Sequence, residues 1–179
     1  CNMKRTKQIN ESREMIVRAF KKLLGESDYK DITMSEIAAE AGLTRTTLYR
    51  HFERKDNLII YIAEQVREKA WSNWRGDRDA IGEIIVSQLV ETKKLPNRPV
   101  LVENEYVWAT AQSFLESSWK DTLAAYIGSD VDEDGYLTLF LLAGFSRIYF
   151  EWLKNDCQES PRELGDKIMS YFARYREAG

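Results

Sequence analysis

The sequence predicts an all-α protein with a small helical domain at residues 1–57 and a larger one at residues 58–179. Two observations lead to this prediction. Apolar residues recur every three or four positions along most of the 179 residues, which is the spacing of amphipathic helices. Strand-like alternation and internal repeats are not found. At 44% hydrophobic residues, a chain of this length can bury a substantial core.

Three helices are predicted in the first domain, and a tight turn separates the last two. The first is an amphipathic helix at residues 12–24. Thr33 and Glu36 have the spacing of a capping box, which starts the second helix. Gly42 allows the turn, and Thr44 can cap the third helix. This arrangement is a helix-turn-helix, in which the last helix enters the major groove of DNA.

The third helix carries side chains suited to contacts with bases. Leu48 and Phe52 lie four residues apart and are expected to point inward, which leaves the polar side chains outward. Arginine can donate two hydrogen bonds to guanine, and threonine can bond a base edge or contact the thymine methyl. We therefore predict that Arg45, Thr46 and Arg50 read bases.

The first domain resembles the DNA-binding domain of the TetR family of bacterial transcriptional regulators. The resemblance covers about 50 residues, and its motifs are Ile37-Ala38-Ala41-Gly42, Thr47-Leu48-Tyr49-Arg50-His51-Phe52 and Lys55-Asp56-Asn57-Leu58. It implies that Thr47, Tyr49, His51 and Lys55 contact the phosphate backbone. Thr33, at a helix start, can attract phosphate in the same way. The full set of predicted DNA contacts is Thr33, Thr44, Arg45, Thr46, Thr47, Tyr49, Arg50, His51 and Lys55.

One alternative is that Tyr49 and His51 only pack the three helices together. His51 is the only histidine, and no partner at metal-ligand spacing accompanies it. We therefore expect no metal site and no cofactor.

Charge is distributed unevenly between the two domains. Residues 1–57 hold 12 lysines and arginines against 9 acidic residues, whereas residues 58–179 hold 14 against 20. The basic domain is the one expected to face DNA. Lys4, Arg5 and Lys7 are predicted to precede the first helix as a short arm that lies along the DNA.

The second domain is predicted to consist of helices throughout. The expected ranges are 57–74, 79–94, 101–127, 132–155, and a last helix from Pro161 to about residue 176. Residues 101–127 form one helix or two, and in the second case the break is expected near 110–113. Pro96 and Pro99 are expected to end helical structure after the helix at residues 79–94. Asp130 to Gly135 is interpreted as an acidic helix start rather than a calcium loop, because Leu141 occupies the twelfth loop position.

The helix at residues 132–155 is apolar on nearly every side, so it must be covered on all sides. Ala143-Gly144 would allow another helix to approach closely. This helix and the last helix are expected to form a four-helix interface in a homodimer, as the resemblance also implies. The homodimer is expected to bind a palindromic DNA operator. The alternative is a monomer in which this helix is central.

The resemblance further implies that a small-molecule effector binds in the second domain. Aromatic walls with few polar anchors would suit it. Arg147 could anchor an anionic effector, although an ion pair with Glu151 is the favoured interpretation. Each aromatic residue could also be plain core. The candidate effector residues are Trp71, Tyr106, Trp108, Phe114, Phe145, Arg147 and Tyr149.

The predicted function is a DNA-binding transcriptional regulator, a repressor controlled by an effector of unknown identity. An enzyme is not expected, because glycine-rich phosphate loops and catalytic Ser or Cys motifs are not found. The alternatives are a TetR-like activator, or a helical ligand-binding or protein-interaction module without DNA binding. Residues 144–155 and the following Ser160-Pro161-Arg162-Glu163-Leu164 resemble a subgroup with activators of dihydroxyacetone-kinase operons. We identify no signal peptide or membrane span and expect a cytoplasmic location.

Overall fold

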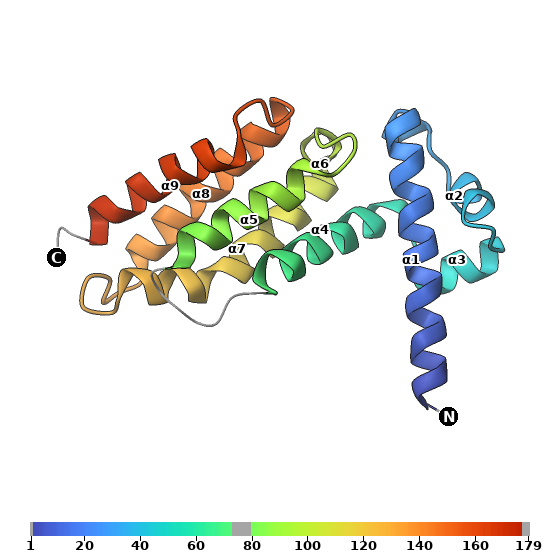
Figure 1. Ribbon diagram of the computed structural model, residues 1–179, viewed down its shortest axis with the longest axis horizontal. Helices are drawn as coiled ribbons and strands as arrows, with labels where there is room; N and C mark the ends of the chain where they lie inside the picture. Colours follow the sequence, from blue (N-terminus) through green and yellow to red (C-terminus); the bar gives the residue numbers. More distant parts are fainter. Residues whose placement is uncertain (1, 73–79, 177–179) are drawn as a thin grey trace.

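The computed structural model describes residues 2–72 and 80–176, and within them the chain forms helices and no strand (Figure 1). The all-α prediction is therefore confirmed. The elements are α1 (Asn2–Glu26), the 3₁₀ helix η1 (Tyr29–Asp31), α2 (Met34–Glu40), α3 (Arg45–His51), α4 (Lys55–Trp71), α5 (Ile81–Lys93), α6 (Val100–Glu103), α7 (Glu105–Ile127), α8 (Tyr136–Lys154) and α9 (Pro161–Arg176).

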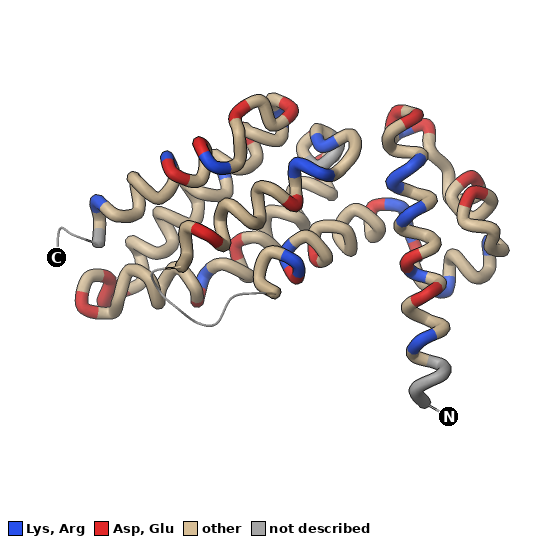
Figure 2. The backbone as a smooth tube through the Cα atoms, in the orientation of Figure 1, with Lys and Arg blue, Asp and Glu red and all other residues tan. Residues whose placement is uncertain are grey.

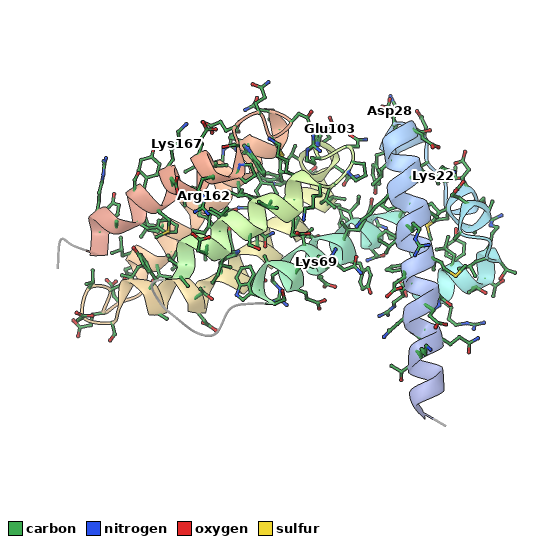
Figure 3. All side chains as sticks on the ribbon, in the orientation of Figure 1. Lys22, Asp28, Lys69, Glu103, Arg162 and Lys167 are labelled. Carbon is green, nitrogen blue, oxygen red and sulfur yellow. The ribbon has the colours of Figure 1, made fainter. Side chains whose placement is uncertain are left out.

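The N-terminal helices α1, α2 and α3 pack around a small apolar core. Phe20 of α1, Ile37 of α2 and Leu48 of α3 are each fully buried. An ion pair at 2.7 Å between Lys22 of α1 and Glu40 of α2 lies at the edge of this core; Lys22 is labelled in Figure 3.

The prediction of a short basic arm before the first helix is wrong. Helix α1 begins at Asn2 and not near residue 12, so Lys4, Arg5 and Lys7 belong to its first turns. Figure 1 shows this end of α1 extending past α3. The apolar stripe begins only where α1 meets the other helices, so it does not mark the start of the helix.

The C-terminal helices form an elongated bundle. Helices α5, α7, α8 and α9 run side by side, and α4 leads from them toward α1 (Figure 1). The interior of the bundle contains large apolar side chains, such as Leu89, Trp119 and Phe145. Helix α4 packs on both α5 and α7, and it is therefore the connection between the bundle and the N-terminal helices.

Two predicted boundaries in this bundle are corrected by local hydrogen bonds. The break in the third predicted helix falls at Asn104 and not at residues 110–113, because the Asn104 side chain accepts a hydrogen bond from the Val107 N–H at 3.1 Å and starts α7. Helix α8 begins at Tyr136 rather than residue 132. The Asp132 carboxylate accepts hydrogen bonds from the first N–H groups of α8, at 2.7 Å for Thr138.

The remaining starts and ends agree with the sequence patterns. The acidic residues before α8 lie next to its N-terminus rather than in its first turn, and the hydrogen bond from the Thr138 side chain holds the pKa of Asp132 below its usual range. The capping box of α9 is also formed, with Ser160 Oγ accepting from the Glu163 N–H at 3.2 Å. The predicted ends at residues 74 and 79 lie outside the described residues. In the two described ranges, no helix has the length and apolar character needed to span a membrane.

Candidate nucleic-acid interface

Two side-chain caps and one glycine turn fix the position of α3. Thr33 Oγ1 accepts from the Glu36 N–H at 3.2 Å, and the Glu36 carboxylate accepts from the Thr33 N–H at 2.8 Å, so the predicted capping box is confirmed. Gly42 has a φ of 66°, in the left-handed region that favours glycine. Thr44 Oγ1 accepts from the Thr47 N–H at 3.2 Å and caps α3, as predicted.

The inward face of α3 is apolar and closely packed. Leu48 is fully buried, and Phe52 packs edge-on against Tyr61 of α4 with ring centroids 5.4 Å apart. The predicted inward orientation of Leu48 and Phe52 is therefore confirmed. This ring contact links the C-terminal end of α3 to α4.

The outward face of α3 carries the predicted base-reading residues. Arg45, Thr46 and Arg50 are exposed, and within the described residues neither arginine forms an ion pair. Tyr49 is 45% exposed. These side chains can approach a ligand without first breaking contacts within the protein. Basic residues also recur along the neighbouring α1 (Figure 2).

His51 lies at the edge of this face, half-buried beside two arginines. Burial lowers the pKa of His51, and the charges of Arg13 and Arg50 lower it further. The imidazole is therefore neutral near neutral pH, and it can donate one N–H to a phosphate oxygen.

Arg13 was not among the predicted contacts. Its guanidinium lies 5.6 Å from the Tyr61 ring centroid, and its buried Nε has no hydrogen-bond partner in the described structure. The signal in the sequence was an arginine on the apolar stripe of the first helix, three residues before Ile16 and seven before Phe20.

Lys55 is placed differently from the prediction of a phosphate contact. Its ammonium donates to the carbonyl oxygens of Tyr29 at 2.5 Å, Ile32 at 2.9 Å and Lys30 at 3.3 Å, and it lies 4.3 Å from the centre of the Tyr29 ring. Burial lowers its pKa. All three donors are used within the protein, so Lys55 fastens the 3₁₀ segment to α4 instead of presenting its charge to DNA.

A buried polar network lies beside Lys55. The Tyr29 hydroxyl donates a hydrogen bond to the Asp56 carboxylate, and Arg54 pairs with the same carboxylate at 2.8 Å. Burial and the hydrogen bond to Asp56 raise the pKa of Tyr29. The Arg54 guanidinium also lies 4.6 Å from the centre of the Tyr106 ring on α7. Arg54 therefore joins the start of α4 to the C-terminal bundle.

The candidate effector residues are not gathered in one place. Tyr106 lies at the Arg54 contact and is 44% exposed. Trp108 packs against Phe150 beside an open groove. Phe145 is a core residue that packs on Trp119 at 5.0 Å. Helix packing directs these three residues to different places, and of them Trp108 lines the open groove, which Arg147 of α8 also lines.

Trp71 and Arg147 also have other partners. Trp71 packs edge-on against Trp119 at 4.4 Å. Arg147 is exposed and forms an ion pair with Glu151, which is the interpretation that the sequence favoured. Phe114 and Tyr149 do line one cavity, of about 30 Å³, between α4, α5, α7 and α8. Arg67 and Gln88 line the same cavity and were missed; a glutamine on the apolar stripe of α5 was the available signal.

Helix α8 is buried on one face and exposed on the other. The exposed face carries Phe140, which is 64% exposed, and the adjacent Ala143 and Gly144. On α9, Tyr175 continues this surface, with its ring 6.5 Å from that of Phe140. Apolar residues exposed on this face are Tyr136, Leu139, Phe140, Tyr171 and Tyr175. One chain therefore does not cover α8 on all sides.

Comparison with known proteins places the N-terminal helices in a family. Residues 16–62 match the family model described as bacterial regulatory proteins of the TetR family. An HTH-type transcriptional regulator of Staphylococcus aureus strain USA300 is 37% identical over 59 residues, which make up 33% of this chain and 32% of that protein. The chain thus aligns with about a third of the length of the curated relatives that it matches.

Solved structures extend the similarity to the whole fold. A TetR transcriptional regulator from Streptococcus agalactiae has a TM-score of 0.65 at 24% identity, covering 96% of this chain and 99% of that one. The dihydroxyacetone kinase operon activator DhaS has a TM-score of 0.72 at 16% identity, covering 93% of this chain and 97% of that one. At these identities the similarity establishes the arrangement of helices.

Proposed function

We propose that this chain is a sequence-specific DNA-binding transcriptional regulator of the TetR family, whose model matches its residues 16–62. The observation that carries the proposal is the contrast between the buried inner face of α3 and its exposed outer face. Its inner face is locked by Leu48 and Phe52, and its outer face presents Arg45, Thr46 and Arg50 without internal partners in the described structure.

The proposed contacts divide into two kinds. Arg45, Thr46 and Arg50 read base edges in the major groove, where arginine can bond guanine through two hydrogen bonds. Thr33, Thr44, Thr47, Tyr49 and His51, joined by Arg13, position the helix on the phosphate backbone. Lys55 supports the domain from inside and is left out of the contact set.

The chain is proposed to act as a homodimer on a palindromic operator. Residues 1–57 form the DNA-binding domain and residues 58–179 the effector-binding and dimerisation domain. The exposed apolar face of α8 and α9, around Phe140 and Tyr175, supports this assembly, because exposed apolar patches commonly mark contacts between proteins. Two recognition helices in successive major grooves require a spacing of about 34–36 Å.

The proposed role is that of a cytoplasmic repressor released by a small-molecule effector, and it includes no enzymatic activity. The route of control is α4, which packs on α5 and α7 and carries α3 through Tyr61 and Phe52. An effector that changes the position of α4 would therefore change the spacing of the two recognition helices. An activator role is the second candidate, and the similarity of the fold to the activator DhaS is the observation that favours it.

Selection from a random pool of double-stranded DNA tests the DNA-binding proposal. The wild-type protein is expected to enrich a palindrome whose half-site centres are one helical turn apart or slightly more. A gel-shift titration with the enriched site and a scrambled site then gives the ratio of the two affinities. Failure to enrich any site, with a folded protein, would instead favour a helical module that does not bind DNA.

A further inference from the structure

The cavity between α4, α5, α7 and α8 has polar groups at two depths. Gln88 and Tyr149 are almost fully buried and lie in its interior. Arg67 and Phe114 are partly exposed and lie at its rim. The volume of about 30 Å³ holds one or two water molecules.

Hydrogen bonds in the interior leave one acceptor without a donor. Thr92 Oγ1 donates to the Gln88 main-chain carbonyl at 2.8 Å, so the Tyr149 hydroxyl, 2.6 Å from Thr92 Oγ1, must donate to it. The Gln88 side chain lines the same cavity as Tyr149, whose hydroxyl proton is already used. Gln88 Oε1 is thereby left without a partner in the described structure, although the residue is only 4% exposed.

The rim supplies a positive charge without a counterion. The Arg67 guanidinium lies 5.6 Å from the Phe114 ring centroid and 6.0 Å from that of Trp71. Its Nε is buried without a hydrogen-bond partner, and no carboxylate of the described residues forms an ion pair with it. A guanidinium among aromatic rings is well suited to bind a planar carboxylate.

We propose that this cavity binds a small aromatic hydroxy acid. The carboxylate pairs with Arg67 at the partly hydrated rim, and the hydroxyl donates to Gln88 Oε1 in the interior. The ring lies among apolar residues between these two ends, which include Ala111, Leu115 and Phe150. This inference names the class of the effector and therefore rests on the proposed function.

Binding of such a ligand requires the cavity to open. A ring of this kind is several times larger than the present volume, so the partly exposed Phe114 must rotate outward. Phe114 belongs to α7 and Arg67 to α4, so a ligand held between them alters the packing of α4 on α7. Ligand binding is thereby coupled to the helix that carries α3.

Calorimetric titration of the protein without DNA tests the proposal. The probes are the three hydroxybenzoate isomers, benzoate, and the hydroxybenzamides that match the isomers. At least one hydroxybenzoate is expected to bind about tenfold more tightly than both benzoate, which lacks the hydroxyl, and its hydroxybenzamide, which lacks the charge. Absence of saturable binding by every isomer at millimolar concentration would overturn the proposal.

Two variants separate the anchors from a general loss of structure. Arg67→Gln should remove the preference for hydroxybenzoate over hydroxybenzamide, and Gln88→Met should remove the preference over benzoate. Arg147→Gln is the matched control, since Arg147 is exposed on α8 and lies outside the cavity; its affinities should equal those of the wild type. An unchanged preference in the first two variants, or an equal loss in the third, would contradict the assignment.

A gel-shift without any probe keeps this inference distinct from the proposed function. The Arg67→Gln and Gln88→Met proteins are expected to bind the selected DNA site as the wild type does. Absence of probe binding by the wild-type protein, with its DNA binding intact, would refute the ligand class alone. Absence of DNA binding by the wild-type protein would refute the proposed regulatory function, whatever the probe titrations show.

Discussion

Replacing Lys55 by methionine separates a structural role from a phosphate contact. The change keeps the length of the apolar side chain and removes the ammonium, which donates to the carbonyls of Tyr29, Lys30 and Ile32. Leaving buried acceptors without a donor typically costs about 1–3 kcal/mol, and these carbonyls are only partly buried. We therefore expect the free energy of unfolding to fall by about 1–2 kcal/mol.

The assay pairs urea denaturation with DNA binding at several salt concentrations. A phosphate contact at Lys55 would lower the slope of log affinity against log salt by about 0.9 per half-site, whereas a structural role leaves the slope unchanged. Lys22→Met is the control, because its ion pair with Glu40 is exposed and worth at most about 1 kcal/mol. A reduced slope together with wild-type stability for Lys55→Met would refute the reasoning.

Three further results are expected. Phe140→Glu places a charge on the exposed apolar face of α8 and should convert dimers into folded monomers in analytical ultracentrifugation; a variant that remains dimeric would place the interface elsewhere. Gly42→Ala forces a residue with a Cβ to a φ of 66° and should cost about 1 kcal/mol in urea denaturation, more than the same change at the exposed helical Gly144. Folding lowers the pKa of His51, so the unfolded state binds a proton more readily, and the free energy of unfolding should fall as the pH drops below about 6.5. His51→Gln should lessen this fall. A pH profile identical to that of the wild type would contradict the lowered pKa.

The local features of the fold could be predicted from the sequence. The caps at Thr33, Thr44 and Ser160 depend on residues within three positions of each other, and all three are present. The inward placement of Leu48 and Phe52 follows from helical spacing alone. Short-range geometry is therefore encoded in short stretches of the chain.

The contacts between distant segments could not be predicted in the same way. Lys55 reaches carbonyl oxygens 23 to 26 positions earlier in the chain, and no spacing rule indicates such a contact. Most of the candidate effector residues were chosen for their aromatic character, and two of them, Phe114 and Tyr149, line the cavity between α4, α5, α7 and α8. Arg13 and Gln88, which have proposed roles, are instead polar residues on apolar stripes of their helices.

The most direct test of the central claim measures the binding of Arg45→Ala to the selected operator and to a scrambled sequence of equal length. If Arg45 reads a guanine, affinity for the operator should fall by about 1–3 kcal/mol per contacted base pair, while affinity for the scrambled sequence changes little. Arg162→Ala, which removes an exposed arginine on α9, should leave both affinities unchanged. A parallel loss of affinity for both sequences in Arg45→Ala would contradict base reading by α3.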